Sequence, residues 1–377
     1  MRRRLPLLLV CFIIKYIDSA NIGIAQIQFK AALHFGDLVY GFGAGLFYVG
    51  FVLFEVPSNL MLANIGVRLT LLRIMTLWGT ISCAMMFVHT PMEFYIARLL
   101  LGAAEAGFFP GLILYLSYWF PAEQRARVTA LSFVALPIAT IIGAPTSGWI
   151  MCQFHDVNGL AGWQWMFLLE GLPTIVFGVI VFFNLEDCPE RAKWLRADEK
   201  TRLTNVLNEE RRLKAGEVGH GGTLAALSDW RVYILGLVSF CAHVLASTIA
   251  FFAPVVIQSA GVRDTFHVGL PYMQRNLGLA VLLLTIATAG HLSSLSVFWT
   301  IPSTDLPPAS AAAGIAVVSS IGGLGGLVGP SLIGYVKSTT GSLEVGLQVA
   351  GCFVLFGSIL LLVNIPARLL SKRASRS

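Results

Sequence analysis

The sequence predicts an all-α integral membrane protein, and three observations carry that prediction. Hydrophobic residues make up 56% of the 377 residues, and charged residues make up only 12%, about half the usual share in soluble domains. Apolar runs of about 20 residues, the length that crosses a bilayer as a helix, recur along the chain. Lysine and arginine are distributed unevenly between the segments that join those runs.

About ten runs are long and apolar enough to span a bilayer. In chain order their ranges are 5–29, 42–63, 69–88, 94–117, 128–151, 163–184, 231–257, 277–299, 311–334 and 343–364. The first run is not a secretory signal, because Lys15 and Asp18 interrupt it and because it is too long. The longest charged stretch follows the sixth run and predicts one or two short amphipathic helices at the membrane surface. We therefore expect a six-helix lobe at 1–184, a cytoplasmic loop at 185–230 and a lobe of about four helices at 231–377.

The distribution of positive charge predicts that both termini are cytoplasmic. In that orientation 20 of the 26 basic residues lie in inside segments, and Lys15 and Arg98 lie within spans. The outside segments hold only four basic residues, which are Lys30, Arg263, Arg275 and Lys337. The net charge of +6 is therefore explained by membrane topology and does not indicate a nucleic-acid partner.

The fourth run holds the most informative residues, because Arg98 and Glu105 place a cation and a carboxylate in an apolar segment. Each such charge costs about 2.5–3.5 kcal/mol on insertion scales, so it usually has a partner or a function. Seven residues are two helical turns, so both side chains lie on one face. Small residues and a proline in this run permit close helix packing or a bend, namely Gly102, Gly107, Pro110 and Gly111.

Metal, cofactor and enzyme chemistry are not indicated. The six cysteines are scattered, without C-x-x-C spacing, which predicts neither a disulfide framework nor a metal site. No nucleophile–base pair and no phosphate-binding loop is found in the sequence. We therefore expect no enzyme activity, no cofactor and no bound metal.

Several short motifs follow one another in order along the chain. They are Asp18-x-x-Asn21-x-Gly23, Glu55-Val-Pro-Ser-Asn59-Leu, Ile65-Gly66-Val-Arg68, the run from Arg98 to Gly111, Trp119-Phe-Pro121 with Arg125-x-Arg127, Trp163-Gln-Trp165-x-Phe-x-x-Glu170-Gly, and Phe298-Trp299-x-Ile-Pro302. In this order and spacing the chain resembles the major facilitator superfamily. Within that superfamily it resembles the anion:cation symporters, which include bacterial tartrate, phthalate and hexuronate permeases. The resemblance covers almost the whole chain and implies a two-lobe helix bundle around a central path.

Three departures from the family pattern are visible. Family members usually carry an arginine directly after the first-helix aspartate, whereas this chain has Ser19 there and Lys15 one turn earlier. Asn64 replaces an arginine in the basic loop after the second run. About 50 residues, corresponding to family helices eight and nine, are absent near position 270, so we expect six plus four helices in place of twelve.

The resemblance implies roles for individual residues. Asp18 and Glu105 are expected to couple transport to protons, because a carboxyl group in a poorly hydrated cavity can load and release a proton. Substrate contacts are expected at Lys15, Ser19, Asn21, Arg98, Ser319 and Ser320. Gate or structural roles are expected at Glu55, Asn59, Gly66, Arg68, Arg125, Arg127 and Glu170, the last paired with a loop arginine. The alternative for the two carboxylates is static pairing, of Asp18 with Lys15 and of Glu105 with Arg98.

The function implied by the resemblance is secondary active transport. We expect a proton-coupled symporter of small organic anions, such as tartrate-, phthalate- or sugar-acid-like carboxylates. It would act as a monomer in the cytoplasmic (inner) membrane of a bacterium, with the lipid bilayer, the anion and the proton as its partners. The alternative is a transport-inactive truncated relative, either a binding or sensory membrane protein or a pseudogene product.

Overall fold

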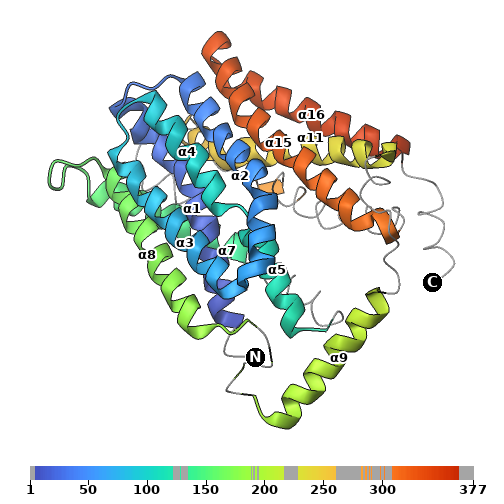
Figure 1. Cartoon of the computed structure of the whole chain (residues 1–377). Helices are drawn as coiled ribbons and strands as arrows, with labels where there is room; N and C mark the ends of the chain where they lie inside the picture. The colour runs from blue at the N-terminus through green and yellow to red at the C-terminus, as the bar shows by residue number, and fades with distance from the viewer. Residues whose placement is uncertain are drawn as a thin grey trace.

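The chain folds into a bundle of long helices, shown in Figure 1. The computed structural model describes residues 5–121, 128, 135–187, 189, 192, 195–215, 228–259 and 308–364, with seven isolated positions between 282 and 301. In these ranges the regular structure is helical, apart from one isolated bridge between Val157 and Leu160 in a turn. The predicted all-α fold is confirmed.

The helices follow the predicted runs closely. Those described are α1 (Leu5–Ala32), α2 (Asp37–Ile65), α3 (Val67–Ala84) with the short 3-10 helix η1 (Met85–Phe87), α4 (Pro91–Glu105), α5 (Phe108–Trp119), α7 (Ala135–Gln153), α8 (Gly162–Asn184), α9 (Ala197–Ala215), α11 (Trp230–Ser259), α15 (Pro308–Thr340) and α16 (Leu343–Asn364). Seven segments of the described chain are long and apolar enough to cross a membrane. The predicted run at 277–299 falls almost wholly outside the described residues, so the count of ten spans stays a prediction.

Local sequence explains where α4 begins and ends. The Thr90 hydroxyl accepts a hydrogen bond from the Glu93 backbone N–H, and the Glu93 carboxylate accepts one from the Thr90 N–H. This capping box, with Pro91 in the first turn, starts the helix. The helix stops at Glu105, because Gly107 has a φ of 87°, a left-handed conformation that glycine adopts without steric cost. The fourth predicted run is therefore two helices, and Glu105 ends the first of them.

Close backbone contacts hold α4 against α2. A Cβ atom at Gly102 would lie 1.9 Å from the Phe47 carbonyl oxygen, and one at Gly50 would lie 2.0 Å from the Leu99 carbonyl oxygen. Any side chain at these positions would push the helices apart. The small residues and the proline of this run were expected to permit close packing or a bend, and the structure shows close packing at Gly102 and the end of α4 at Gly107.

Similar contacts join the early helices to the late ones. A Cβ atom at Gly41 of α2 would lie 2.3 Å from the Pro330 carbonyl oxygen of α15. One at Gly23 of α1 would lie 2.7 Å from the Ala250 carbonyl oxygen of α11. Helices α2 and α15 run side by side in Figure 1, and both α11 and α16 pack against α15. The helices before and after the charged stretch therefore touch through small residues.

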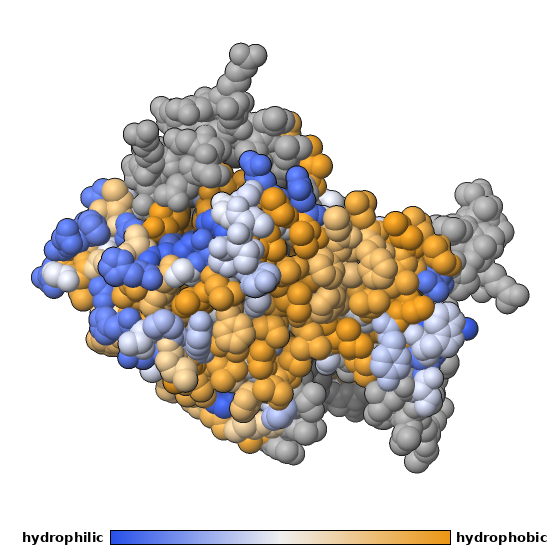
Figure 2. Space-filling model, turned by 90° about the horizontal axis from the view of Figure 1, so that it is seen from above, coloured by the Kyte–Doolittle hydropathy of each residue, from blue (hydrophilic) through white to orange (hydrophobic). Residues whose placement is uncertain are grey.

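The surface and the interior have the pattern of a membrane protein. Figure 2 shows hydrophobic side chains over most of the described surface in that view, with hydrophilic residues gathered toward one side. Large exposed apolar residues include Leu53, Phe54, Phe183, Leu362 and Val363. Several charged residues are instead buried inside the bundle. The charged helix α9 stands apart from the bundle in Figure 1, which agrees with the predicted surface helix between the sixth and seventh runs.

Candidate functional site

The central charged contact joins α1 to the end of α4. Lys15 Nζ lies 3.0 Å from Glu105 Oε1, and the Glu105 side chain is only 1% exposed. Lys15 therefore pairs with Glu105 and not with Asp18, and Arg98 does not pair with Glu105. Neither of the two static pairings considered from the sequence is formed. The break at Gly107 contributes to this arrangement, since it makes Glu105 the last residue of its helix.

Asp18 is held by neutral donors instead of by a cation. Its carboxylate accepts hydrogen bonds from Trp78 Nε1 at 2.5 Å, from Ser82 Oγ at 2.6 Å and from Asn21 Nδ2 at 3.2 Å. Trp78 and Ser82 are four residues apart and project from one face of α3. Asp18 is 3% exposed and faces the interior of the bundle. Sequence reasoning missed Trp78 and Ser82, whose spacing of four was the available signal but whose residue types are common in packed helices.

Arg98 is a buried cation without a carboxylate partner among the described residues. It is 3% exposed, and its guanidinium donates a long hydrogen bond of 3.4 Å to the Ala44 carbonyl oxygen. The guanidinium carbon lies 5.0 Å from the centre of the Phe47 ring and 5.7 Å from that of Phe251, so two aromatic faces flank it. Its Nε is buried without an acceptor. The side chain therefore keeps N–H donors in a planar fork that suits a carboxylate.

Glu170 lies on α8 with Ser147 of α7 as its donor. Ser147 Oγ donates to Glu170 Oε1 at 2.5 Å, while Glu170 Oε2 is buried without a hydrogen-bond partner. The expected pairing with a loop arginine is not found in the part of the chain that the structure describes. Arg125 and Arg127, which could supply such a partner, lie outside it.

The remaining residues that were expected to contact substrate form fewer hydrogen bonds with the rest of the protein. The Ser19 hydroxyl is buried without a hydrogen-bond partner. Ser319 and Ser320 are half-buried on α15, and no hydrogen bond among the described residues joins them to the charged groups of α1 and α4. Glu55 is half-buried on α2, and Asn59 lies in the same helix with its side chain outside the described part.

The turn between α2 and α3 is tied to the end of α8. The Arg68 backbone N–H donates to Asp187 Oδ1 at 2.9 Å, and its side-chain Nε donates to the Phe182 carbonyl oxygen. The Arg68 guanidinium also lies 4.3 Å from the centre of the Phe182 ring. Gly66 has a φ of 86°, and a Cβ atom there would lie 3.0 Å from the Asp187 carboxylate. Asp187, just after α8, is thus a partner of this turn that sequence reasoning missed.

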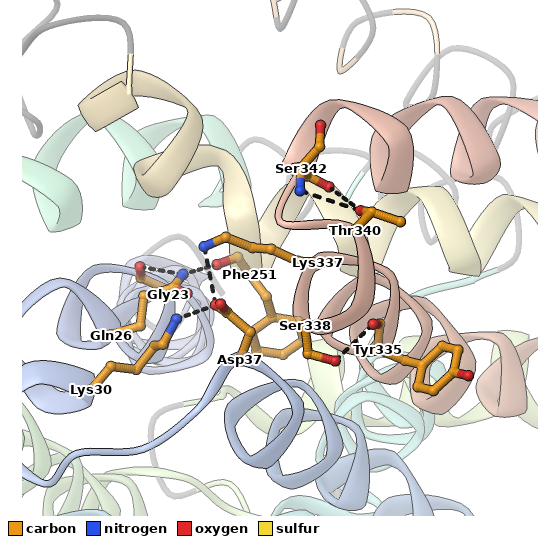
Figure 3. Close-up of polar contacts among 10 residues, drawn as sticks. All are labelled: Gly23, Gln26, Lys30, Asp37, Phe251, Tyr335, Lys337, Ser338, Thr340 and Ser342. Atoms are coloured by element: carbon orange, nitrogen blue, oxygen red, sulfur yellow. Dashed lines mark hydrogen bonds and ion pairs between the residues drawn. The ribbon is translucent and has the colours of Figure 1, made fainter.

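A second charged group lies at the end of the bundle where α1 ends and α2 begins. We call it the Asp37 cluster, which consists of Asp37, Lys30 and Lys337 (Figure 3). Asp37 pairs with Lys30 of α1 and, at 3.0 Å, with Lys337 of α15. Beside it, Gln26 Nε2 donates to the Phe251 carbonyl oxygen of α11. These contacts join the early and late helices, and the sequence separation of 300 between Asp37 and Lys337 hid the link from sequence analysis.

Comparison with known proteins identifies the class. The family model described as Major Facilitator Superfamily matches residues 8–301, which is more than half of the chain. A protein of Agrobacterium vitis that carries the name of a tartrate transporter is 40% identical over 405 residues, covering 96% of this chain and 93% of the relative. The chain therefore belongs to the major facilitator superfamily of membrane transporters. This membership confirms that its class is a transporter and not an enzyme.

Other relatives and solved structures agree. The inner membrane transport protein RhmT of Escherichia coli K12 is 30% identical, covering 95% of this chain and 92% of the relative. A bacterial homologue of the human lysosomal transporter Spinster, inward-facing and occupied, matches with a TM-score of 0.73 at 13% identity, over 96% of each chain. The inward-open xylose transporter XylE of E. coli matches with a TM-score of 0.72 at 14% identity, over 94% of each chain. These two structures support the fold alone.

The alignment also supports an internal loss. It runs over 405 positions, whereas 96% of this 377-residue chain amounts to about 362 residues. About 40 positions of the relative therefore have no counterpart in this chain. The loss expected near position 270 has a similar size, and its place falls in a segment that the structure does not describe.

Proposed function

We propose that this protein is a proton-coupled symporter of small organic anions in the cytoplasmic membrane of a bacterium. The observation that supports it most is Arg98, a buried guanidinium with no carboxylate partner in the described structure. A buried cation left without a counterion is costly unless an anion binds to it. The relatives named for tartrate transport, at 40% identity, favour a carboxylate such as tartrate, phthalate or a sugar acid as that anion.

In this proposal Arg98 is the principal anion contact, and Lys15 contacts the anion only when Glu105 is protonated. Lys15 is already neutralised by Glu105 at 3.0 Å, so it has little charge to offer while Glu105 is ionised. Arg98 can offer two parallel N–H donors to one carboxylate. Ser19, Ser319 and Ser320 would supply neutral hydrogen bonds, and Asn21 is already engaged by Asp18.

The ion pair suggests how a proton could be coupled to the anion. When a proton binds to Glu105, that carboxyl group becomes neutral and no longer holds Lys15 electrostatically. Lys15 can then donate to a second oxygen of the anion, so proton binding and anion binding favour each other. Loss of the proton restores the pair and releases the anion. Asp18, which is held by neutral donors, is the second proton-binding residue of the proposal.

The proposed cycle moves two lobes, at 1–184 and 231–377, that are joined by the cytoplasmic loop at 185–230. With both termini inside, the Asp37 cluster lies at the outer end, where the contacts of α2 with α15 and of α1 with α11 close the path. Glu55, Asn59, Gly66, Arg68, Arg125 and Arg127 would shape the inner gate. The protein is proposed to act as a monomer, because Lys15, Arg98 and Glu105, the charged residues of the proposed mechanism, lie buried or nearly buried within one chain.

Uptake into liposomes tests the proposal. Purified protein is reconstituted, and accumulation of labelled tartrate, phthalate or galactarate is measured with and without an inward proton gradient. We expect at least one of these anions to accumulate only with the gradient. Proton-coupled anion symport would be rejected if accumulation were the same with and without the gradient, or if none of the three anions accumulated.

A transport-inactive relative is the second candidate, and the absence of about 40 positions found in the relatives favours it. Titration calorimetry with the same anions distinguishes a binding or sensory protein from a pseudogene product. Binding without uptake would indicate a binding or sensory membrane protein. Neither binding nor uptake would indicate a pseudogene product.

A further inference from the structure

Among the described residues of α1 to α8, the buried charges do not balance. Two cations and three carboxylates are buried or nearly so among the described residues, and they are Lys15, Arg98, Asp18, Glu105 and Glu170. Lys15 neutralises Glu105, and Arg98 forms no ion pair in the described structure. Asp18 and Glu170 are therefore stabilised by neutral donors only. Keeping both ionised away from water is unfavourable, and one proton shared between them would relieve the cost.

The two carboxyl groups lie on helices that pack against each other, Asp18 on α1 and Glu170 on α8. Both are buried, with exposed fractions of 3% and 8%. Because neither group is screened by water, a charge on either carboxyl group makes a charge on the other less favourable.

The hydrogen bonds of Glu170 also favour a neutral carboxyl group. Ser147 satisfies Oε1, but Oε2 is buried and has no partner. An unsatisfied oxygen costs more in an ionised carboxylate than in a neutral acid, because the charge must be desolvated as well. Asp18, by contrast, has three donors that suit an ionised carboxylate.

The helices packed against α8 bring no cation to this site among the described residues. On the buried side, α1 presents Asp18, and α3 presents the Cys83 thiol, which points to the Leu168 carbonyl oxygen at 3.7 Å. The only titratable side chain of α7 is Cys152, at its exposed end. The short helix η1 contains only Met and Phe.

We propose that Glu170 is a further proton-binding residue, and that Glu170 and Asp18 together hold one proton. This inference rests on the proposed function for its role in the transport cycle, but proton binding itself requires no substrate. It assigns α8 to proton coupling, together with α1 and α4. The only chemical step is proton transfer, in which an O–H bond breaks at one carboxyl oxygen and an O–H bond forms at the other.

Acid-induced infrared difference spectroscopy on the purified full chain tests proton binding directly. The carbonyl stretch of a protonated carboxyl group should appear in the parent protein and be lost or reduced in Glu170→Gln. Glu344→Gln, at an exposed position on α16, is the matched control and should leave the band unchanged. A band that is identical in Glu170→Gln and the parent would overturn the proposal. Since no anion is added, this result is independent of whether the protein transports anything.

A second pair of measurements places Glu170 in the cycle. In proteoliposomes, Glu170→Gln should reduce gradient-driven accumulation at least tenfold while exchange of labelled for unlabelled anion stays within about twofold. A merely structural role would reduce both together, and that result would overturn the coupling role. If Glu170→Gln does not fold, Asp18→Asn serves instead, because it should change the pH at which the remaining carboxyl band appears. An unchanged pH for that band would contradict a shared proton.

Discussion

At the scale of single residues, the Lys15–Glu105 pair is the contact on which the proposed coupling depends. In Glu105→Gln the amide keeps the shape of the side chain but cannot titrate. We expect gradient-driven accumulation to be lost, while exchange of labelled for unlabelled anion persists within about twofold. Both are measured in proteoliposomes, with Glu344→Gln as the control. Undiminished accumulation in Glu105→Gln would remove Glu105 from the mechanism.

Arg98 and Lys15 can be separated by their effects on anion binding. A charge-assisted hydrogen bond is worth about 1.5–3 kcal/mol, so Arg98→Gln should weaken binding about 10- to 150-fold. Lys15→Ala should have a smaller effect at a pH where Glu105 is ionised, because the pair already occupies Lys15. Calorimetry of both variants measures the difference.

Arg98→Lys sharpens the same prediction. Lysine keeps the charge but loses the planar fork, so we expect it to restore only part of the affinity. Tight binding in Arg98→Gln, with strong weakening in Lys15→Ala, would transfer the anion contact from Arg98 to Lys15.

Single residues also mark the limit of sequence reasoning at this site. The sequence alone showed four charged residues within apolar runs, where charges are rare. They are Asp18, Lys15, Arg98 and Glu105. Their partners were not readable, because Glu105 pairs with a residue 90 positions away in the chain. A helix face follows from spacing, whereas a contact between helices depends on how the helices pack.

At the scale of elements, the backbone contacts between α2 and α4 give a stability prediction. A methyl group at Gly102 would overlap the Phe47 carbonyl oxygen, so the two helices would have to separate. We expect Gly102→Ala to destabilise the protein by roughly 1–3 kcal/mol, measured as a lower thermal midpoint in detergent.

Gly351 supplies the matched control for this substitution. It lies in α16, and a Cβ atom there would meet nothing within 4 Å. Gly351→Ala should therefore leave the midpoint unchanged or raise it slightly, because alanine favours a helix. Equal losses in both variants would mean that close packing at Gly102 contributes nothing special.

The Asp37 cluster predicts a change in the contact between α2 and α15. Spin labels at the exposed positions 38 and 338, after removal of the exposed Cys152 and Cys352, report the separation of these helices. We expect Lys337→Ala to increase the population with longer distances. Lys30→Ala should have a smaller effect, because that lysine joins only α1 and α2. A distribution unaffected by Lys337→Ala would show that the ion pair does not stabilise this contact.

Element boundaries were predictable where sequence alone sets them. The apolar runs predict helix positions to within a few residues, whereas the Thr90–Glu93 capping box, a local signal that the sequence analysis did not use, starts α4 at Pro91. The division of the fourth run into α4 and α5 was only half visible. Gly107 was one of four residues expected to permit close packing or a bend, and the sequence did not show which of them would end the helix; in the structure Gly107 does, with a φ of 87°.

At the scale of the whole molecule, the topology has a direct test. Cysteines at position 158, in the turn between α7 and α8, and at position 201, on α9, should label from opposite sides of the membrane. The reason is the positive-inside distribution, which places the charged loop inside and the turn outside. Labelling of both from one side would contradict the proposed orientation.

The class of protein could be predicted from the sequence, because every helix that crosses a bilayer needs a long run of apolar residues, and these runs dominate the composition. The contacts between early and late helices could not be predicted from the sequence. Gly41, Gly23 and Lys337 each contact a partner on a helix that is distant in the chain.

The central claim is that a proton and an organic anion move together through this protein. The most direct measurement adds tartrate to proteoliposomes that start at equal pH on both sides, and follows the internal pH with a trapped dye. We predict that the tartrate gradient acidifies the interior in the parent protein and fails to do so in Glu105→Gln. Tartrate entry in the parent without internal acidification would contradict the account.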